Sequence, residues 1–407
     1  MTDGDSIAAA IGEIVDAGDL GGAVTLVWRG GREVQFAAVG RRDLETGAPM
    51  TRDAIFRIAS LSKPITSTAA LTLFDEGRFA LDDPITQVAP EFADMRVLRD
   101  VNGPVEDTVP ANRSITFGDL LTHRAGLTYG GFHSGPISEA YAKALGGDID
   151  SEFQPDDWLA RLAALPLIGQ PGGELTYGHA TDVLGLLIAR MEGAPLGDVL
   201  QRRVFGPLGM VDSGFVVPPE KHDRRVGNCG FDAAGQLTAR LAPGDAFLPR
   251  RPDDMTYVSG GAGLWSTLDD YLAFARTFLG DGSVDGVQLL KPQTRDLMRT
   301  NHLTPDQRAK STMMGSRPFA VGHGFGLGLA VVLEPDQAPV TRCKGGVGTV
   351  GWPGAYGGWW QADPVDGSVM IFLTHNMFDL DQLLQGIGLG AFAAVERFHA
   401  LASTMPR

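Results

Sequence analysis

The chain has 407 residues, of which 43% are hydrophobic and 20% charged, and its 34 basic and 49 acidic side chains give a formal net charge of −15. This composition excludes a disordered chain, and the length allows one large domain or two closely packed ones. The acidic balance argues against nucleic acid as a partner, because a protein that binds a phosphate backbone needs a basic surface.

Membrane insertion and export are also disfavoured by the sequence. No apolar run reaches the roughly 20 residues that a membrane-spanning helix needs. Residues 1–5 (MTDGD) are acidic where a secretory signal would be basic. We therefore expect a cytoplasmic protein with no membrane partner.

Neither the cysteines nor the histidines form a pattern typical of a metal site. Cys229 and Cys343 lie far apart in the sequence, and two cysteines in a chain of this kind are expected to be reduced thiols. The HExxH and CxxC patterns are lacking, and the eight histidines are scattered. We expect neither a metal nor another cofactor.

The predicted elements begin with a β-hairpin. Residues 22–30 (GAVTLVWRG) and 33–40 (EVQFAAVG) are short runs rich in β-branched and aromatic residues, separated by Gly30 and Gly31. Such runs on either side of a glycine turn are typical of two antiparallel strands. We therefore expect the chain to start with strands.

A helix is predicted to begin near Ser60. Ile65, Ala69 and Leu73 recur at four-residue spacing, which is the spacing of one helix face, and Gly77 supplies a C-terminal stop. This pattern predicts a buried helix of about four turns.

The middle of the chain is predicted to consist of helices joined by long Pro- and Gly-rich loops. Thr116 and Asp119 have the spacing of a helix cap. Residues 158–165 and 183–191 have helical periodicity, and the second run stops at Gly193.

Strands return in the last third of the chain. An amphipathic helix is predicted over residues 267–279, followed by strands over 324–333 (GFGLGLAVVL), 357–362 and 368–374 (SVMIFLT). An apolar helix over residues 383–401 is predicted to follow them.

This order of elements indicates an α+β fold with a helical insertion. Strands near both ends of the chain are expected to meet in one sheet. We predict a discontinuous α/β domain formed by residues 1–82 and 250–407, and a mainly helical domain formed by residues 83–249.

The sharpest chemical feature is an S-x-x-K pattern at the start of the predicted buried helix. Ser60 and Lys63 are three residues apart, so they share a helix face and the amine can reach the hydroxyl. A serine hydroxyl needs a neighbouring base to become a nucleophile, and the N-terminus of a helix offers N–H groups to an oxyanion. The alternative is that Ser60 caps the helix and Lys63 is a solvated surface residue.

Four segments around this pattern resemble the class C β-lactamase-like serine hydrolases. They occur in that family's order, over about residues 50–375, and the S-x-x-K pattern is a known signature of such enzymes. The resemblance implies the fold of serine β-lactamases and DD-peptidases, in which an antiparallel sheet flanked by helices adjoins an all-helical lobe. The segments are residues 56–66 (FRIASLSKPIT), 119–127 (DLLTHRAGL), 204–210 (VFGPLGM) and 260–267 (GGAGLWST).

The family's second catalytic element is a tyrosine in a Y-x-N motif. Tyr177-Gly178-His179 occupies the corresponding place, with His179 where the family has asparagine. The resemblance implies that Tyr177 passes protons between Ser60, Lys63 and the leaving group. His179 either lines the substrate site or is a structural residue.

The family's third element, K-T-G, has no counterpart with a lysine in this place. Trp352-Pro353-Gly354 precedes the last two predicted strands, and W-x-G in that position resembles the family VIII carboxylesterases. The resemblance implies that Gly354 lets the substrate approach the backbone and that the N–H of Ala355 pairs with that of Ser60 as an oxyanion hole.

Two further residues in or near these motifs have more than one possible role. Lys344-Gly345-Gly346 would restore a lysine in place of the W-x-G segment, although no strand-like run follows it directly. His123, in the DLLTHRAGL segment, is interpreted as helix-end packing rather than as a catalytic base.

The predicted activity is that of a serine carboxylesterase with a small-molecule ester as its substrate. Ser60, Lys63 and Tyr177 would form and hydrolyse an acyl-enzyme. The missing K-T-G lysine and Y-x-N asparagine favour small or short-chain neutral esters over β-lactams. The alternatives are a β-lactamase, D-amino-acid peptidase or acyltransferase using the same serine, or a non-catalytic ligand-binding protein. Loops 129–147 and 232–257 are expected to shape the pocket.

Overall fold

The main sheet of the protein is antiparallel throughout. The computed structural model describes residues 3–240 and 257–405, and within these residues the sheet has seven strands in the order β11-β12-β13-β14-β15-β1-β2. These strands are β11 (His323–Phe325), β12 (Ala330–Val332), β13 (Val350–Gly351), β14 (Trp359–Asp363), β15 (Ser368–Thr374), β1 (Gly22–Arg29) and β2 (Arg32–Gly40).

Strands from the two ends of the chain meet in this sheet. The predicted hairpin is present as β1 and β2, and β15 coincides with the predicted run SVMIFLT. β1 pairs with β15 from Ala23 opposite Thr374 to Trp28 opposite Val369. Every residue of β15 is buried, which explains why the run is apolar without alternation.

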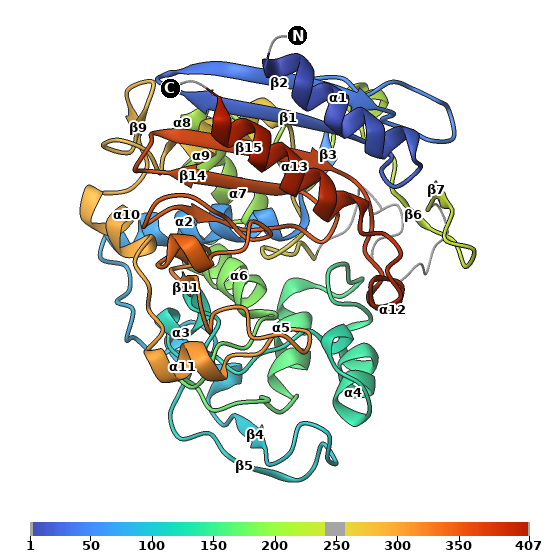
Figure 1. Cartoon of the computed structure of the whole chain (residues 1–407). Coiled ribbons are helices and arrows are strands. Elements are labelled where there is room, and N and C mark those ends of the chain that lie inside the picture. Colours follow the sequence, from blue (N-terminus) through green and yellow to red (C-terminus); the bar gives the residue numbers. More distant parts are fainter. Residues whose placement is uncertain (1–2, 241–256, 406–407) are drawn as a thin grey trace.

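Helices cover both faces of the sheet (Figure 1). α1 (Asp3–Asp16) and α13 (Gly390–Thr404) pack on one face, where they form an apolar cluster with Trp359, Met370 and Phe372. Residues that alternate with these, such as Ile371 and Leu373, point to the other face and join the larger core. α2 (Ser62–Asp75) and α9 (Leu268–Arg276) lie on that side.

The expectation that the chain starts with strands is wrong, because α1 precedes β1. Ile7, Ile11 and Ile14 recur at helical spacing and are buried against the sheet. That periodicity was present in the sequence and predicts the helix.

The predicted single strand over residues 324–333 is also wrong. The segment forms two short strands, β11 and β12, that fold back on each other. Gly328 at the turn has a φ of 92°, and a Cβ there would lie 2.2 Å from Ser67 Oγ of α2. The glycine therefore permits both the left-handed turn and its close contact with the central helix.

The apolar segment 383–401 is divided rather than forming one helix. α12 (Leu380–Leu384) ends before Gly386 and Gly388, whose φ angles are 82° and 80°, and α13 begins at Gly390. Two glycines in the left-handed region interrupt a helix that apolar periodicity alone would continue.

A region of helices and loops lies below the sheet in Figure 1. The predicted cap is present as a capping box between Thr116 and Asp119, and α6 ends at Gly193 in the left-handed conformation. The two-domain division stays a prediction, and its boundary at 249–250 lies outside the described residues. The helices in this region are α3 (Phe117–Leu121), α4 (Pro136–Leu145), α5 (Pro155–Ala163) and α6 (Ala180–Glu192). They are followed in the chain by α7 (Leu196–Leu200) and α8 (Gly206–Leu208), and α8 contacts α9 beside the sheet (Figure 1).

Smaller elements complete the described part of the chain. Two more helices are α10 (Pro292–Met298) and α11 (Pro305–Lys310). The short strand pairs are β3 (Phe56–Arg57) with β8 (Trp265–Ser266), β4 (Arg96–Leu98) with β5 (Thr108–Pro110), β6 (Cys229–Phe231) with β7 (Leu237–Ala239), and β9 (Ser283–Val284) with β10 (Val287–Gln288).

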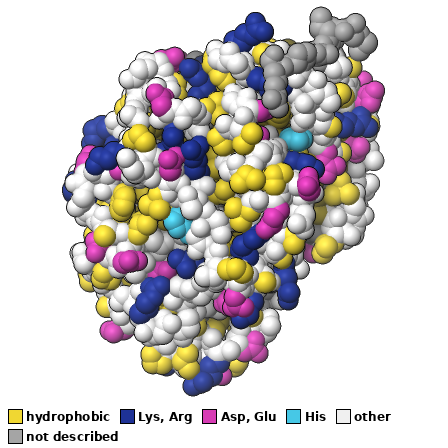
Figure 2. Space-filling view, turned by 60° about the vertical axis from the view of Figure 1, so that its left-hand side comes forward, with side chains coloured by type: hydrophobic (Ala, Val, Ile, Leu, Met, Phe, Trp, Pro, Cys, Tyr) yellow, Lys and Arg dark blue, Asp and Glu magenta, His cyan; other side chains and the backbone are white. Residues whose placement is uncertain are grey.

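The central helix α2 is enclosed by the rest of the fold. Eleven of its fourteen residues are buried, including Lys63 near its N-terminus, so this amine is held among protein atoms rather than in solvent. Across residues 3–240 and 257–405, no helix combines the length and apolar content needed to cross a bilayer. The surface seen in Figure 2 interleaves basic and acidic side chains.

Candidate active site

Ser60 lies in a short 3-10 turn, Ala59–Leu61, that leads directly into α2. The turn is anchored by a backbone hydrogen bond of 2.9 Å from Ile58 N to Leu264 O. Ala59 has a φ of 45°, a conformation that residues with a side chain rarely adopt. The serine is therefore presented by a strained and well-anchored backbone rather than by a regular helical turn.

Lys63 contacts three oxygen atoms, and one of them belongs to Ser60. Its Nζ lies 3.2 Å from Ser60 Oγ, 3.1 Å from Tyr129 OH and 2.9 Å from the carbonyl oxygen of Gly261. The carbonyl can only accept a hydrogen bond, whereas both hydroxyls can also donate. A neutral amine can thus donate to Gly261 and Tyr129 and still accept the proton of Ser60.

Tyr177 contacts Ser60 from a second direction. Its hydroxyl lies 2.8 Å from Ser60 Oγ, and Lys63 Nζ lies 4.6 Å from the centroid of its ring. Gly178 explains how the chain reaches this position, since a Cβ there would lie 2.3 Å from Thr128 Cα. The missing side chain allows segment 177–179 to pack directly on the segment that carries Tyr129.

Trp352 and Gly354 both lie beside the serine turn. The indole Nε1 of Trp352 donates a hydrogen bond of 3.0 Å to Tyr177 OH. A Cβ on Gly354 would lie 2.8 Å from the carbonyl oxygen of Ile58 and 2.9 Å from Leu61 Cδ1. Only a glycine allows this part of the chain to approach residues 58–61 so closely.

Two backbone donors beside the nucleophile are not used by the fold. Among residues 3–240 and 257–405, neither Ser60 N–H nor Ala355 N–H donates to a backbone or side-chain acceptor. Ala355 is half-buried and belongs to the same apolar cluster as Ala59 and Ala262. These N–H groups are thus available to an oxygen atom of a substrate.

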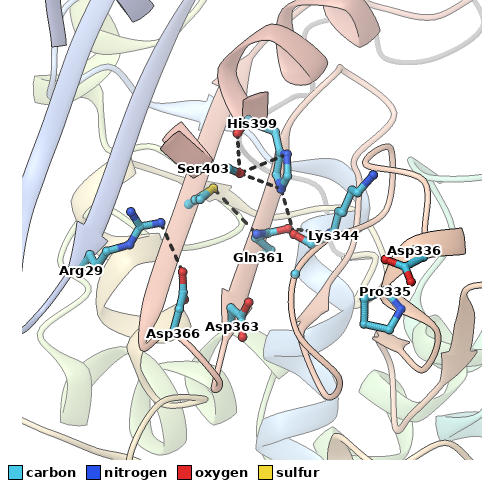
Figure 3. Close-up of a pocket in the computed structure, with 11 residues that line it drawn as sticks. Arg29, Pro335, Asp336, Lys344, Gln361, Asp363, Asp366, His399 and Ser403 are labelled. Atoms are coloured by element: carbon cyan, nitrogen blue, oxygen red, sulfur yellow. Dashed lines mark hydrogen bonds and ion pairs between the residues drawn. The ribbon is translucent and has the colours of Figure 1, made fainter. Parts of the chain in front are cut away.

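Lys344, the alternative to the W-x-G segment, lines a pocket whose lining does not include Ser60 or Tyr177 (Figure 3). Its carbonyl oxygen is 2.8 Å from His399 Nε2 of α13, and its N–H donates to Gln361 Oε1. Lys344 lines a pocket of about 290 Å³ together with Arg29 and Asp363. It makes none of the contacts that join Trp352 to Tyr177.

Two residues that contact Lys63 were not predicted from the sequence. Tyr129 follows the DLLTHRAGL segment, and burial, with the nearby Asp182 carboxylate, raises the pKa of its phenol well above the usual value. Gly261 belongs to the GGAGLWST segment, and a Cβ there would lie within 3.3 Å of Lys63 Nζ and 3.2 Å of Tyr129 OH. The only sequence signal for their place in the site is that they lie within or beside segments that resemble the family.

His179 is enclosed by protein side chains. It is 0% exposed, and its Nδ1 lies 3.0 Å from Asp182 Oδ2 and its Nε2 3.6 Å from Asp148 Oδ1. Its ring also packs against Tyr129 and Trp158. Of the two interpretations of His179, the structural one fits these surroundings.

His123 has the surroundings of a packing residue. It is fully buried at the end of α3, with its ring centroid 4.9 Å from that of Tyr177 and 5.7 Å from that of Phe325. Burial, together with the charge of Lys63, holds the pKa of His123 well below its usual value. Its imidazole is therefore neutral at physiological pH.

The cysteines and possible metal ligands contribute no further site in the described part of the chain. Cys229 and Cys343 are free and buried, and burial raises the pKa of Cys229 to about 12. No group of three or more His, Cys, Asp or Glu residues is arranged to hold a metal ion among residues 3–240 and 257–405. The predicted pocket loop 232–257 lies partly outside the described residues.

Comparisons with known proteins show similarity along nearly the whole chain. The beta-lactamase family model matches residues 7–387. Protein Rv1367c of Mycobacterium tuberculosis is 46% identical over 376 residues, which cover 92% of this chain and 91% of that protein. Esterase EstB of Burkholderia gladioli is 32% identical over 396 residues, covering 93% and 92%. The solved structure of EstCE1, titled a hydrolase with promiscuous acyltransferase activity, has a TM-score of 0.77 and 27% identity over 97% of this chain and 99% of that one.

Proposed function

The chain belongs to the beta-lactamase family and is a serine hydrolase, and on this premise we propose that it is a carboxylesterase acting on small or short-chain esters through an acyl-enzyme on Ser60. One observation carries the proposal. Ser60 Oγ is contacted at once by Lys63 Nζ at 3.2 Å and by Tyr177 OH at 2.8 Å. These are the neighbours that a serine needs to lose its proton as it attacks and to return that proton to a leaving group.

In the acylation step, Ser60 Oγ attacks the ester carbonyl while its proton passes to Lys63 or Tyr177. The carbonyl oxygen becomes an oxyanion, and the unused N–H groups of Ser60 and Ala355 would stabilise it. Tyr177 then donates a proton to the departing alkoxide, which leaves as the alcohol. The acyl group remains attached to Ser60.

In the deacylation step, a water molecule takes the place of the alcohol. Lys63 and Tyr177 accept its proton as it attacks the acyl carbonyl, and Ser60 recovers the proton when the acid leaves. The reaction consumes one ester and one water and yields one acid and one alcohol. None of these steps requires a cofactor.

The surroundings of the serine favour a neutral ester over a β-lactam. The indole of Trp352 lies beside Tyr177, where the family's K-T-G lysine would otherwise supply a cation for a substrate carboxylate. The apolar cluster that contains Tyr177 and Trp352 also contains Phe319 and Phe325. Such a wall suits an uncharged acyl or alcohol group, and the W-x-G arrangement supports assignment to the family VIII carboxylesterases.

Acyl transfer is a second candidate, supported by the similarity to EstCE1. In that reaction an alcohol or amine replaces water in the deacylation step, and no other part of the scheme changes. We also propose a cytoplasmic location, supported by the two free thiols, which are typical of reducing compartments. Cell fractionation with an antibody to the chain tests the location.

Parallel assays of the wild type and Ser60→Ala test the proposed function. The substrates are p-nitrophenyl butyrate and nitrocefin, and a fluorophosphonate probe reports covalent labelling of Ser60. We expect butyrate hydrolysis and labelling that both vanish in Ser60→Ala, with little nitrocefin turnover. Dominant nitrocefin turnover would instead indicate a β-lactamase, and equal activity in both proteins would refute the Ser60 mechanism. Faster release of p-nitrophenol upon addition of an acceptor alcohol, with formation of the new ester, would indicate acyl transfer.

A further inference from the structure

We propose that His179 is a positioning residue that fixes Tyr129 and Gly261, the two groups that contact Lys63 in addition to Ser60. The inference rests on the proposed function, because Lys63 serves there as a proton acceptor. It assigns to the third residue of the Y-x-H segment a role that needs no contact with substrate. Two carboxylates, the partly buried Asp148 and the fully buried Asp182, connect His179 to the two groups.

Both nitrogen atoms of His179 face a carboxylate oxygen. Nδ1 lies 3.0 Å from Asp182 Oδ2, within hydrogen-bond distance, and Nε2 lies 3.6 Å from Asp148 Oδ1, within ion-pair distance. Burial alone would lower the pKa of His179, but the two carboxylates outweigh it and raise the pKa above its usual value. A positively charged imidazolium between two negative groups is the arrangement that this geometry favours.

The connection through Asp148 leads to Tyr129. The carboxylate of Asp148 accepts hydrogen bonds of 2.9 Å from the N–H groups of Gly130 and Gly131, which directly follow Tyr129. The ring of His179 also packs edge-on against that of Tyr129, with a centroid separation of 4.6 Å. Asp148 therefore holds the backbone that follows Tyr129, and His179 packs against its ring. The Tyr129 hydroxyl lies 3.1 Å from Lys63 Nζ.

The connection through Asp182 leads to Gly261. Asp182 Oδ1 accepts a hydrogen bond of 2.9 Å from Gly261 N–H and another from Ser259 Oγ. The carbonyl oxygen of Gly261 in turn accepts from Lys63 Nζ at 2.9 Å. Asp182 is fully buried, so these contacts are not exchanged with solvent.

The charged groups that face His179 are two carboxylates. Asp148 and Asp182 place one carboxylate at each nitrogen atom of the His179 ring. The other titratable side chains packed around His179 are the phenols of Tyr129 and Tyr141. Without the imidazolium, the two carboxylates would lose the cation that lies between them and holds both in position.

Steady-state kinetics of His179→Asn and Asp148→Asn with p-nitrophenyl butyrate test the proposal. His179→Asn introduces the residue that the family's own motif carries, and Asp148→Asn keeps the side-chain shape while removing the charge. We expect kcat to fall about 10- to 100-fold in each variant, while KM changes by less than about 3-fold. His323→Asn is the matched control, because His323 is also fully buried but hydrogen-bonds the Cys343 carbonyl.

Repeating the Asp148→Asn measurement in a Tyr129→Phe variant shows whether Asp148 acts through Tyr129. If Asp148 acts through Tyr129, Asp148→Asn should lower kcat by less than about 2-fold when Tyr129 is already phenylalanine. A purely structural loss would lower kcat by the same factor in both backgrounds. Equal factors would therefore overturn this part of the proposal.

The remaining outcomes separate this proposal from the proposed function. A wild type that is not labelled at Ser60 by the fluorophosphonate would refute the proposed function itself. A labelled wild type with unchanged kcat in folded His179→Asn and Asp148→Asn would refute positioning alone. A raised KM with unchanged kcat would also refute it, because that result indicates substrate contact. If His179→Asn does not fold, Asp148→Asn, whose side chain is 19% exposed, decides the question.

Discussion

The indole Nε1 of Trp352 donates a hydrogen bond of 3.0 Å to the phenol oxygen of Tyr177, the same atom that lies 2.8 Å from Ser60 Oγ. The residue in place of a motif lysine therefore serves the proton-transferring side chain directly. A fixed N–H donor stabilises negative charge on the phenol oxygen whenever that oxygen gives up its proton. In this site Trp352 can therefore act both as an apolar packing residue and as a hydrogen-bond donor to Tyr177.

Replacement of Trp352 by phenylalanine should separate these two functions of the side chain. Trp352→Phe keeps an aromatic ring beside Phe319 and Phe325 but removes the N–H donor. We expect kcat for p-nitrophenyl butyrate to fall about 10- to 100-fold. The same change at buried Trp360, which packs on Tyr271, is the control. Equal kcat values for wild type and Trp352→Phe would show that the hydrogen bond has no part in turnover.

Gly354→Ala should damage both stability and activity. The new Cβ would lie 2.8 Å from the carbonyl oxygen of Ile58, so the serine turn or the W-x-G segment must move. We expect a loss of about 1–3 kcal/mol in the free energy of unfolding, and fluorophosphonate labelling of Ser60 that is slower than in wild type. Gly358→Ala is the matched control, because its Cβ would meet nothing closer than 3.7 Å. Similar behaviour of the two variants would contradict the close approach.

Asp270 should make the stability of the protein depend on pH. Burial raises the pKa of Asp270 above its usual range, to about 6, although Ser213 and the N–H of Asp212 donate hydrogen bonds to it. The folded state thus binds the proton more tightly than the unfolded state. The resulting stabilisation is fully present below about pH 4 and is lost as the pH rises through about 6.

Asp270→Asn removes this titration while keeping one oxygen for both donors, which bind the same atom, Oδ2. The variant should therefore be more stable than wild type above pH 6, by about 1–3 kcal/mol, with a smaller difference at pH 4. Thermal unfolding of both proteins between pH 4 and 8 measures it. A difference in Tm that is the same at every pH would be inconsistent with a raised pKa.

His123→Asn should affect folding more than chemistry. Asparagine tolerates the φ of 53° that His123 adopts, but it loses the ring contacts with Tyr177 and Phe325. We expect a loss of about 1–3 kcal/mol in stability and a change in kcat of less than about 10-fold. A loss of activity as complete as that of Ser60→Ala would instead identify His123 as a catalytic base.

The fold was predictable where a segment's residue pattern matched its own secondary structure. The hairpin of β1 and β2, the strand β15 and the central helix α2 were predicted because β-branched runs or four-residue periodicity extend over their whole length. The family resemblance added the antiparallel sheet and its flanking helices, which the structure confirms. The errors at residues 324–333 and 383–401 have one cause. Apolar patterning continues through glycines such as Gly328 and Gly386, whose backbone conformation reverses or interrupts the element.

The candidate site was predictable only where its residues belong to motifs. Ser60, Lys63 and Tyr177 were selected in this way, and the structure brings them together. The Asp148 and Tyr129 contacts arise from loops whose course depends on packing. The local sequence does not reveal that Gly178 packs against Thr128, a contact that brings the segments of Tyr177 and Tyr129 together.

The pairing of β1 with β15 has a consequence for the synthesis of the chain. β1 is complete by Arg29, but the strand that covers its second edge ends at Thr374, so the growing polypeptide exposes an unpaired apolar strand during most of translation. Exposed strand edges favour self-association, and long-range pairing is slow to form. Production of the protein should therefore benefit from slow translation or abundant chaperones, and a ribosome stalled before codon 368 should carry a chain that cannot close its sheet.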